Sequence, residues 1–194
     1  MHGWWAISYI ALWFLVVALA LLVVALARQV GTLHLRLGPR GALEIDDEGP
    51  PLGDAPDPAI ERDLDGREVA VGGPGRAQLL LFVSPECPVC REVLPSVQAV
   101  ASAARLDPLV VSDADHEHAA AAYRRRPGAP VVAAPELHRH YRVPGTPFAV
   151  VLDETGTVRA KGTVNNLEQV EGLVETARRR QEELHATAGV PATP

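Results

Sequence analysis

An unbroken apolar stretch opens the chain, and apolar and polar positions begin to alternate only after it. Residues 4–27 read WWAISYIALWFLVVALALLVVALA, with no charged side chain. At a rise of about 1.5 Å per residue, a helix of this length crosses a hydrocarbon core about 30 Å thick. Trp4, Trp5 and Tyr9 at one end and Arg28 at the other are typical of membrane interfaces. We therefore predict one transmembrane helix over residues 4–27, in contact with lipid.

The flanks of this helix bear on cleavage and on orientation. Ala25 and Ala27 form a small-residue pattern like that of a signal-peptide cleavage site, but the amino-terminal flank lacks Lys and Arg. We therefore favour an uncleaved anchor. Arg28, Arg36 and Arg40 follow the helix, and the positive-inside rule would keep the rest of the chain in the cytoplasm. Charge alone leaves the topology open.

Short segments of alternating type follow a linker rich in Gly, Pro and Asp. QLLLFV at 78–83 is typical of a strand buried on both faces, and ERDLDGREVAV before it offers two short strands around a turn at Asp65 and Gly66. We expect helices at 91–104, 116–126, 135–141 and 167–180, and further strands at 109–112, 131–134, 148–153 and 157–164. This alternation predicts an α/β fold in which helices flank a mixed sheet.

These patterns divide the chain into five expected parts. In order they are a tip at 1–3, the membrane helix at 4–27, a juxtamembrane segment and linker at 28–51, a folded domain at 52–182, and a disordered tail at 183–194. With 24 acidic against 18 basic side chains, the formal charge of -6 argues against nucleic acid as a partner. The domain is therefore expected to act on something other than DNA or RNA.

The two cysteines carry the candidate chemistry. They lie three positions apart in SPECPVCREVLP, directly after the buried strand, so no framework of long-range disulfides exists. Cys87 falls at the strand-to-helix turn, with Pro88 at the first helical position, where a missing N–H has no consequence. The helix N-terminus stabilises a thiolate there, and Cys90, one turn further in, can attack a mixed disulfide held on Cys87. We predict Cys87 as the attacking thiol and Cys90 as the resolving thiol.

A metal site is the alternative for a C-x-x-C pair. A second cysteine pair is absent, and zinc would have to recruit from His116, His118, His138 and His140, whose H-x-H spacing does not suit a Cys2His2 site. An anchored copper metallochaperone using both cysteines with His138 or His140 is a further alternative. We expect neither a bound metal nor a cofactor.

Two prolines strengthen the redox interpretation. Pro95 lies inside the predicted CxxC helix, where it removes a backbone hydrogen bond and should kink the helix. Pro147 follows Thr146 in VPGTPFAVVLD, and a cis bond there would bring the backbone of Thr146 against the cysteines, where it could bind a client peptide as an added strand.

CPVCREVLP, GTPFAVVLD, a hairpin and a final helix together resemble the thioredoxin superfamily. With the membrane helix, ALARQVGTLHLRLGPRGAL, FVSPECPVC and RAKGTVNNLEQVEGL, nearly the whole chain resembles the MauD family of methylamine dehydrogenase accessory proteins. This resemblance implies a single-pass inner-membrane protein with its domain in the periplasm. Its expected partners are the disulfide-rich small (beta) subunit of methylamine dehydrogenase, as client in amine metabolism, and a redox-recycling protein.

The chain departs from thioredoxin at the site. Glu86 stands where thioredoxin has a tryptophan, and Leu81 where it has a buried aspartate that helps to move protons. Pro88 and Val89 between the cysteines shape the site and tune its potential, but in a direction that their identity does not give. Oxidase, reductase and isomerase activity, including a general thiol reductase of the cytochrome c maturation type, therefore stay open.

Overall fold

The computed structural model describes residues 3–36, 48–123 and 128–188, and the chain forms two compact units, 1–38 and 39–194. In the first unit, α1 (Gly3–Arg36) contains a stretch, Gly3–Val23, that is long and apolar enough to cross a membrane. A signal sequence shares these properties. None of this stretch is buried by other described parts of the structure, and Phe14, for example, is 73% exposed. The helix continues past Ala27 to Arg36, and residues 28–36 contain no proline that would end it.

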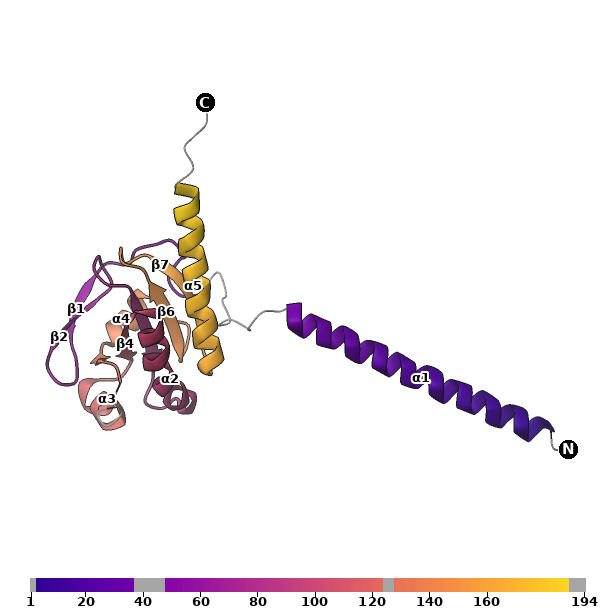
Figure 1. Ribbon diagram of the computed structural model, residues 1–194. Coiled ribbons are helices and arrows are strands. Elements are labelled where there is room, and N and C mark those ends of the chain that lie inside the picture. The colour runs from indigo at the N-terminus through magenta and orange to yellow at the C-terminus, as the bar shows by residue number, and fades with distance from the viewer. Residues whose placement is uncertain (1–2, 37–47, 124–127, 189–194) are drawn as a thin grey trace, which may run out of the picture. The chain divides into compact units, whose positions relative to one another are not determined.

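The second unit is an α/β domain with a five-stranded sheet (Figure 1). Its elements in chain order are β1 (Ala59–Arg62), β2 (Glu68–Val71), β3 (Gln78–Val83), α2 (Pro88–Ala104), β4 (Asp107–Ser112), α3 (His116–Tyr123), β5 (Val131–Ala133), α4 (Pro135–His140), β6 (Phe148–Leu152), β7 (Val158–Thr163) and α5 (Leu167–Ala188). The predicted strand at 78–83 is confirmed at both ends. The predicted helix at 116–126 is found as far as Tyr123, and residues 124–126 lie outside the described residues.

The sheet is mixed, as predicted, with the strand order β5-β4-β3-β6-β7. β3, β4 and β5 are parallel, whereas β6 runs antiparallel to β3 and β7 antiparallel to β6. All five positions of β3 from Leu79 to Val83 are buried, because helices or the β1–β2 hairpin cover both of its faces. The carboxyl end of β3 therefore opens at the centre of the sheet, directly before the CxxC turn.

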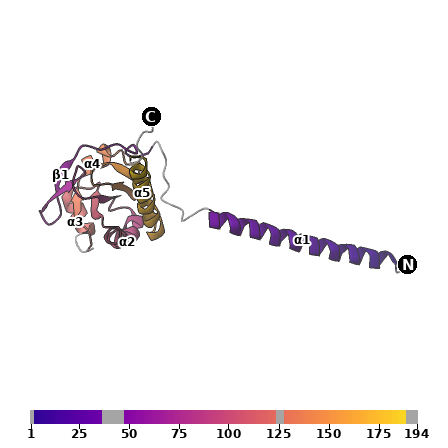
Figure 2. The same ribbon diagram turned by 45° about the horizontal axis from the view of Figure 1, so that its top comes forward.

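Two separate cores lie on the two faces of the sheet. On one face, α2, α3 and α5 pack against Leu79, Leu81 and Val83, and α2 and α5 lie side by side (Figures 1 and 2). On the other face, α4 and β2 pack against Leu80 and Phe82. Alternate side chains of β3 thus belong to different cores, and the sheet separates them.

Residues 48–54 belong to the domain, although we expected a linker up to residue 51. The buried Lys161 donates a hydrogen bond from its ammonium to the carbonyl of Glu48 (2.5 Å), and the backbones of Gly53 and Asp54 bond to Val158 (2.9 and 2.8 Å). The Gly- and Pro-rich sequence correctly indicates no helix or strand here. Composition does not reveal that an irregular segment binds to the edge of a sheet.

The last helix is longer than predicted. α5 continues to Ala188, so residues 183–188, which we assigned to the disordered tail, are helical, and 189–194 lie outside the described residues. The apolar face that signals the helix ends at Ala177, because only the first part of α5 packs on the sheet. Beyond it, polar helix formers extend the helix, and Arg178 forms an ion pair with Glu182 (3.1 Å).

Two turns of the same type close the hairpins. Asp63 and Asp153, both buried, each accept hydrogen bonds from the backbone N–H groups two and four residues later. Gly66 and Gly156 occupy the fourth position with φ of 82° and 81°. Their surroundings differ, because a Cβ at Gly156 would lie 2.7 Å from the backbone N of Gly73, whereas a Cβ at Gly66 would meet nothing within 4 Å.

We predict that Gly156→Ala destabilises the domain more than Gly66→Ala does. Both changes place a Cβ at positive φ, which costs about 1 kcal/mol, and only Gly156→Ala also forces two backbones apart, for a total of about 2 kcal/mol or more. The urea midpoint of each variant measures the difference. Equal losses in the two variants would contradict this account.

Candidate active site

Cys87 caps the helix that follows the central strand. The chain turns after β3 through a bond from the Cys87 N–H to the Ser84 carbonyl (3.1 Å), and Cys87 itself has an extended backbone. Its Sγ accepts a hydrogen bond from the N–H of Cys90 (3.1 Å), so sulfur satisfies one of the free N–H groups at the start of α2. Pro88 occupies the first turn, as predicted. The half-exposed sulfur therefore lies in the field of unpaired N–H groups that favours negative charge.

Cys90 lies behind Cys87 in the core. Its side chain is fully buried among the apolar residues of the face that carries α2. Burial, and then the bond to Cys87, raise the pKa of the Cys90 thiol to about 12, against smaller opposing effects of Ser84 and Thr146. Both cysteines are free thiols in this structure. Cys90 is therefore protonated at neutral pH and becomes a nucleophile only if its proton is removed.

The loop before β6 brings Thr146 and Pro147 to the cysteines. The Thr146–Pro147 peptide bond is cis, as predicted, and Pro147 is buried. The Cys87 thiol donates a hydrogen bond to the Thr146 carbonyl, with Sγ and O 3.6 Å apart, across 59 positions of sequence. The structure thus brings Cys90 and Thr146 into contact with Cys87.

The remaining predicted residues lie on α2. Val89 is half-buried against the core, whereas Pro88 and Pro95 are exposed. The helix passes through Pro95 and continues to Ala104, so this proline lies within α2 without ending it. Val89 is therefore the residue between the cysteines that faces the fold, and Pro88 is the one that faces solvent.

Glu86, directly before Cys87, interacts electrostatically with a charged pair at the start of α3 that sequence reasoning missed. The Ser84 hydroxyl donates to the carboxylate of Glu86 (2.8 Å), and this bond lowers the Glu86 pKa. Asp115 bonds to His118 (2.9 Å) and raises the pKa of that imidazole, and the charges of His118 and Glu86 also influence each other. The signal was present in Asp115 and His118, three positions apart around the start of α3, but we considered His118 as a possible zinc ligand and did not consider Asp115.

His138, one of the histidines considered as a metal ligand, lies apart from the cysteines. His138 bonds to the Val111 carbonyl (3.1 Å) and packs edge-on against Phe82 (ring centroids 5.0 Å apart), so it belongs to the core on the other face of the sheet from Cys90. Within residues 3–36, 48–123 and 128–188, no three His, Cys, Asp or Glu side chains gather as metal ligands. A copper site shared by the cysteines and His138 would have to reach through the sheet.

Known proteins share both the domain and the longer sequence pattern. Residues 64–178 match the family model described as a thioredoxin-like domain. The methylamine utilization protein MauD of Methylobacillus flagellatus is 38% identical over 176 residues, which cover 88% of this chain and 85% of that protein. MauD of Methylorubrum extorquens is 37% identical over 174 residues, and these cover 87% of this chain and 84% of that protein.

Solved structures share the fold at low sequence identity. The thioredoxin domain of a thiol-disulfide oxidoreductase from Bacteroides vulgatus is 17% identical with a TM-score of 0.51, covering 65% of this chain and 97% of that one. A thiol:disulfide interchange protein from Bacteroides sp. is 18% identical with a TM-score of 0.50, covering 67% of this chain and 90% of that one. These similarities establish a thioredoxin-like architecture for the domain.

We predict that alkylation of Cys90 is slow at neutral pH and accelerates steeply with pH. In a Cys87→Ala variant, burial alone still raises the Cys90 pKa, so the rate with iodoacetamide should rise about tenfold per pH unit from pH 7 to about pH 9, because the thiolate fraction stays small over this range. Mass spectrometry of quenched samples measures the rate, and Cys90→Ala, which retains the half-exposed Cys87, is the control. A rate for Cys90 that levels off below about pH 9 would contradict the prediction.

Proposed function

The chain belongs to the MauD family of methylamine utilization proteins and carries a thioredoxin-like domain, and from this premise we propose that it is a membrane-anchored thiol-disulfide oxidoreductase. Its proposed client is the disulfide-rich small subunit of methylamine dehydrogenase, which it helps to mature. The observation that carries the proposal is the position of the Cys87 sulfur, which touches both the N–H of Cys90 and the carbonyl of Thr146.

We assign the two cysteines the roles that their surroundings favour. Cys87 is the attacking thiol, because its sulfur is partly exposed at the helix N-terminus. Cys90 is the resolving thiol, because it is buried within hydrogen-bonding distance of Cys87 and reacts only with a sulfur already bound there. Pro88 and Val89 set the reduction potential through the geometry of the turn, and Pro95 shapes the helix behind it.

Thr146 and Pro147 form the proposed client-binding edge. The Thr146 carbonyl contacts the Cys87 thiol now, and it becomes available to a client N–H when a mixed disulfide replaces that thiol hydrogen. A client segment would thus lie as a short added strand beside the loop, with its cysteine over Cys87. Recognition through main-chain atoms suits a client that presents many different disulfides.

Each reaction step conserves electrons and protons. When a client disulfide is reduced, the Cys87 thiolate attacks one client sulfur, the other client sulfur leaves and is protonated, and a mixed disulfide remains. Cys90 then loses its proton and attacks the Cys87 sulfur, which releases the second client thiol and forms the Cys87–Cys90 disulfide. The reverse sequence oxidises the client. If instead another client thiolate attacks the client sulfur of the mixed disulfide, a new client disulfide forms, Cys87 leaves as the thiolate, and the client is isomerised without net electron transfer. A recycling partner restores the pair after net oxidation or reduction.

We place the domain in the periplasm, with α1 as a single-pass anchor in the inner membrane. Disulfides persist in the periplasm and are rare in the cytosol, so a disulfide-rich client matures there. The arginines after the membrane span argue for the opposite orientation. The two arguments make opposite predictions for where the cysteines can be labelled.

We expect Cys90→Ala to trap a covalent complex with the client. Without the resolving thiol, the mixed disulfide on Cys87 persists, and non-reducing electrophoresis with mass spectrometry should show an adduct that a reductant releases. The matched control is Cys87→Ala, which keeps the buried thiol and should form none. Absence of an adduct from Cys90→Ala in cells that make the client would show that Cys87 is not the attacking thiol.

Topology is tested by a thiol reagent that cannot cross the inner membrane. In intact cells whose outer membrane has been permeabilised, we expect labelling of Cys87 after mild reduction, because the domain faces the periplasm. Labelling before reduction would also report the resting redox state. Lysed cells serve as the control for reactivity, and labelling confined to them would place the domain in the cytoplasm and exclude a periplasmic client.

A further inference from the structure

Two buried tyrosines have hydroxyl groups without a hydrogen-bond partner among the described residues. Tyr123 is 1% exposed and Tyr141 is fully buried, and neither hydroxyl reaches a donor or acceptor there. A buried polar group without a partner usually has a compensating role, because burial without a hydrogen bond is unfavourable. The two tyrosines lie in different cores, Tyr123 in the core of Cys90 and Tyr141 in the core of α4.

Of the two tyrosines, only Tyr123 lies on the same face of the sheet as Cys90. Burial raises the pKa of both phenols, and for Tyr141, whose pKa rises to about 12, burial is the only cause. For Tyr123 the negative charges of Cys90, Asp113, Cys87 and Glu86, in that order, raise the pKa further. Tyr123 therefore stays neutral and keeps the proton that it can donate to a negative sulfur.

The other elements packed around Cys90 offer little to a thiolate from the inner side. The buried side chains that β3 turns to this core, Leu79, Leu81 and Val83, have no polar atom. Ser112 of β4 lies on the same face by strand alternation, and its hydroxyl accepts from the N–H of Ala114 (3.3 Å), but Ser112 is not among the groups that shift the Cys90 pKa. Ser84 and Thr146 lower the Cys90 pKa through hydrogen bonds, and the carboxylates of Asp113 and Glu86, whose charges act on Tyr123, have no proton to donate at neutral pH.

We propose that the Tyr123 hydroxyl is a positioning group for the resolving thiol, and that its dipole stabilises the Cys90 thiolate from the inner side of the core. This inference rests on the proposed disulfide exchange. When a mixed disulfide is held on Cys87, the Cys90 thiol releases its proton and its sulfur attacks the Cys87 sulfur. The Cys87–client bond breaks, and the departing client sulfur takes up a proton. Tyr123 keeps its own proton throughout and lowers the free energy of the intermediate Cys90 thiolate.

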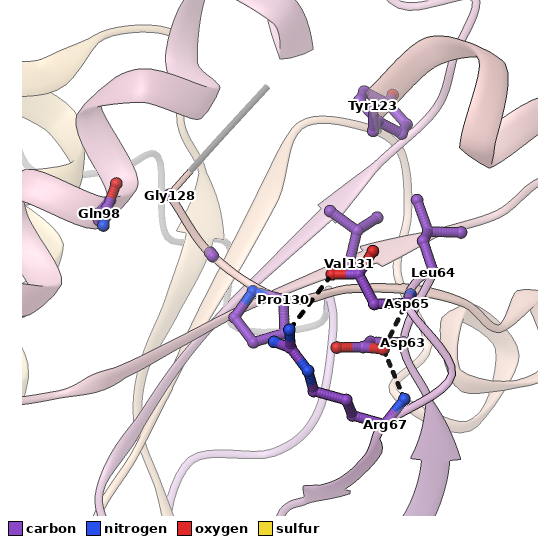
Figure 3. Close-up of a pocket in the computed structure, with 10 residues that line it drawn as sticks. Asp63, Leu64, Asp65, Arg67, Gln98, Tyr123, Gly128, Pro130 and Val131 are labelled. Carbon is purple, nitrogen blue, oxygen red and sulfur yellow. Dashed lines mark hydrogen bonds and ion pairs between the residues drawn. The ribbon is translucent and has the colours of Figure 1, made fainter. Parts of the chain in front are cut away.

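The hydroxyl of Tyr123 can be removed without removing the ring that packs in the core. Its ring lines a cavity of about 350 Å³ together with Gln98, Gly128, Pro130 and the turn at Asp63, and Figure 3 shows Tyr123 at one end of α3 beside this space. Tyr123→Phe keeps the ring and removes only the hydroxyl. Tyr141→Phe makes the identical change at the other buried, unpartnered hydroxyl, on the face of the sheet away from the cysteines.

The test follows the two steps of disulfide exchange separately, using the full chain in detergent micelles. The reduced protein is mixed with an aromatic disulfide that releases a coloured thiolate. A first release reports attack by Cys87, and a second reports displacement by Cys90. In Tyr123→Phe we expect an unchanged first phase and a second phase about ten times slower, as when the Cys90 pKa rises by one, with its pH profile displaced to higher pH. Tyr141→Phe should leave both phases unchanged.

The outcomes separate this inference from the proposed function. If wild type gives no second release, Cys90 does not resolve mixed disulfides and the proposed function fails. If wild type gives both releases and the second-phase pH profile of Tyr123→Phe superimposes on that of wild type, the role of Tyr123 is wrong. Equal slowing of both phases in Tyr123→Phe would also overturn it, because that result indicates a general structural defect.

Discussion

The hydrogen bond from the Cys90 N–H to the Cys87 sulfur is the constraint on which the site depends. It makes one atom both the cap of α2 and the candidate nucleophile, so the helix cannot begin without placing that sulfur at its positive end. Its position is further fixed by β3, whose buried strand delivers the chain to this turn from the centre of the sheet. The thiol is therefore positioned by the packing of the domain rather than by a mobile loop.

Sequence patterns identified the elements whose signal is local. The apolar run of β3 and Pro88 at the start of α2 have strong intrinsic preferences, and the structure confirms both placements. The cis bond before Pro147 is also confirmed, but its prediction came from the context of the CxxC motif and not from an intrinsic preference. Patterns failed where the decisive contact is distant in sequence. Lys161 binding the Glu48 carbonyl spans 113 positions, and no periodicity reports such a bond. The end of α5 was missed because its last turns are mostly exposed and polar, so they carry no periodic apolar face.

The face of the sheet on which a polar side chain lies decides whether it can influence the cysteines. His138 and Tyr141 belong to the core of α4, where the sheet screens them from the cysteines, whereas Tyr123 belongs to the core of Cys90. Counting histidines and tyrosines along the chain cannot make this distinction, because α3 and α4 follow each other closely yet cover opposite faces. A residue's chemical relevance here depends on the side of the sheet that its helix covers.

Both outer strands of the sheet are occupied by irregular parts of the same chain. Asp63 bridges to Val132 on β5, and the backbones of Gly53 and Asp54 pair with Val158 at the start of β7. Unpaired strand edges are templates for pairing between molecules. These edge contacts favour a dispersed population over self-association. In the membrane-anchored state that we propose, where copies would meet at high local density, they would restrict intermolecular strand pairing to surfaces such as the loop before β6.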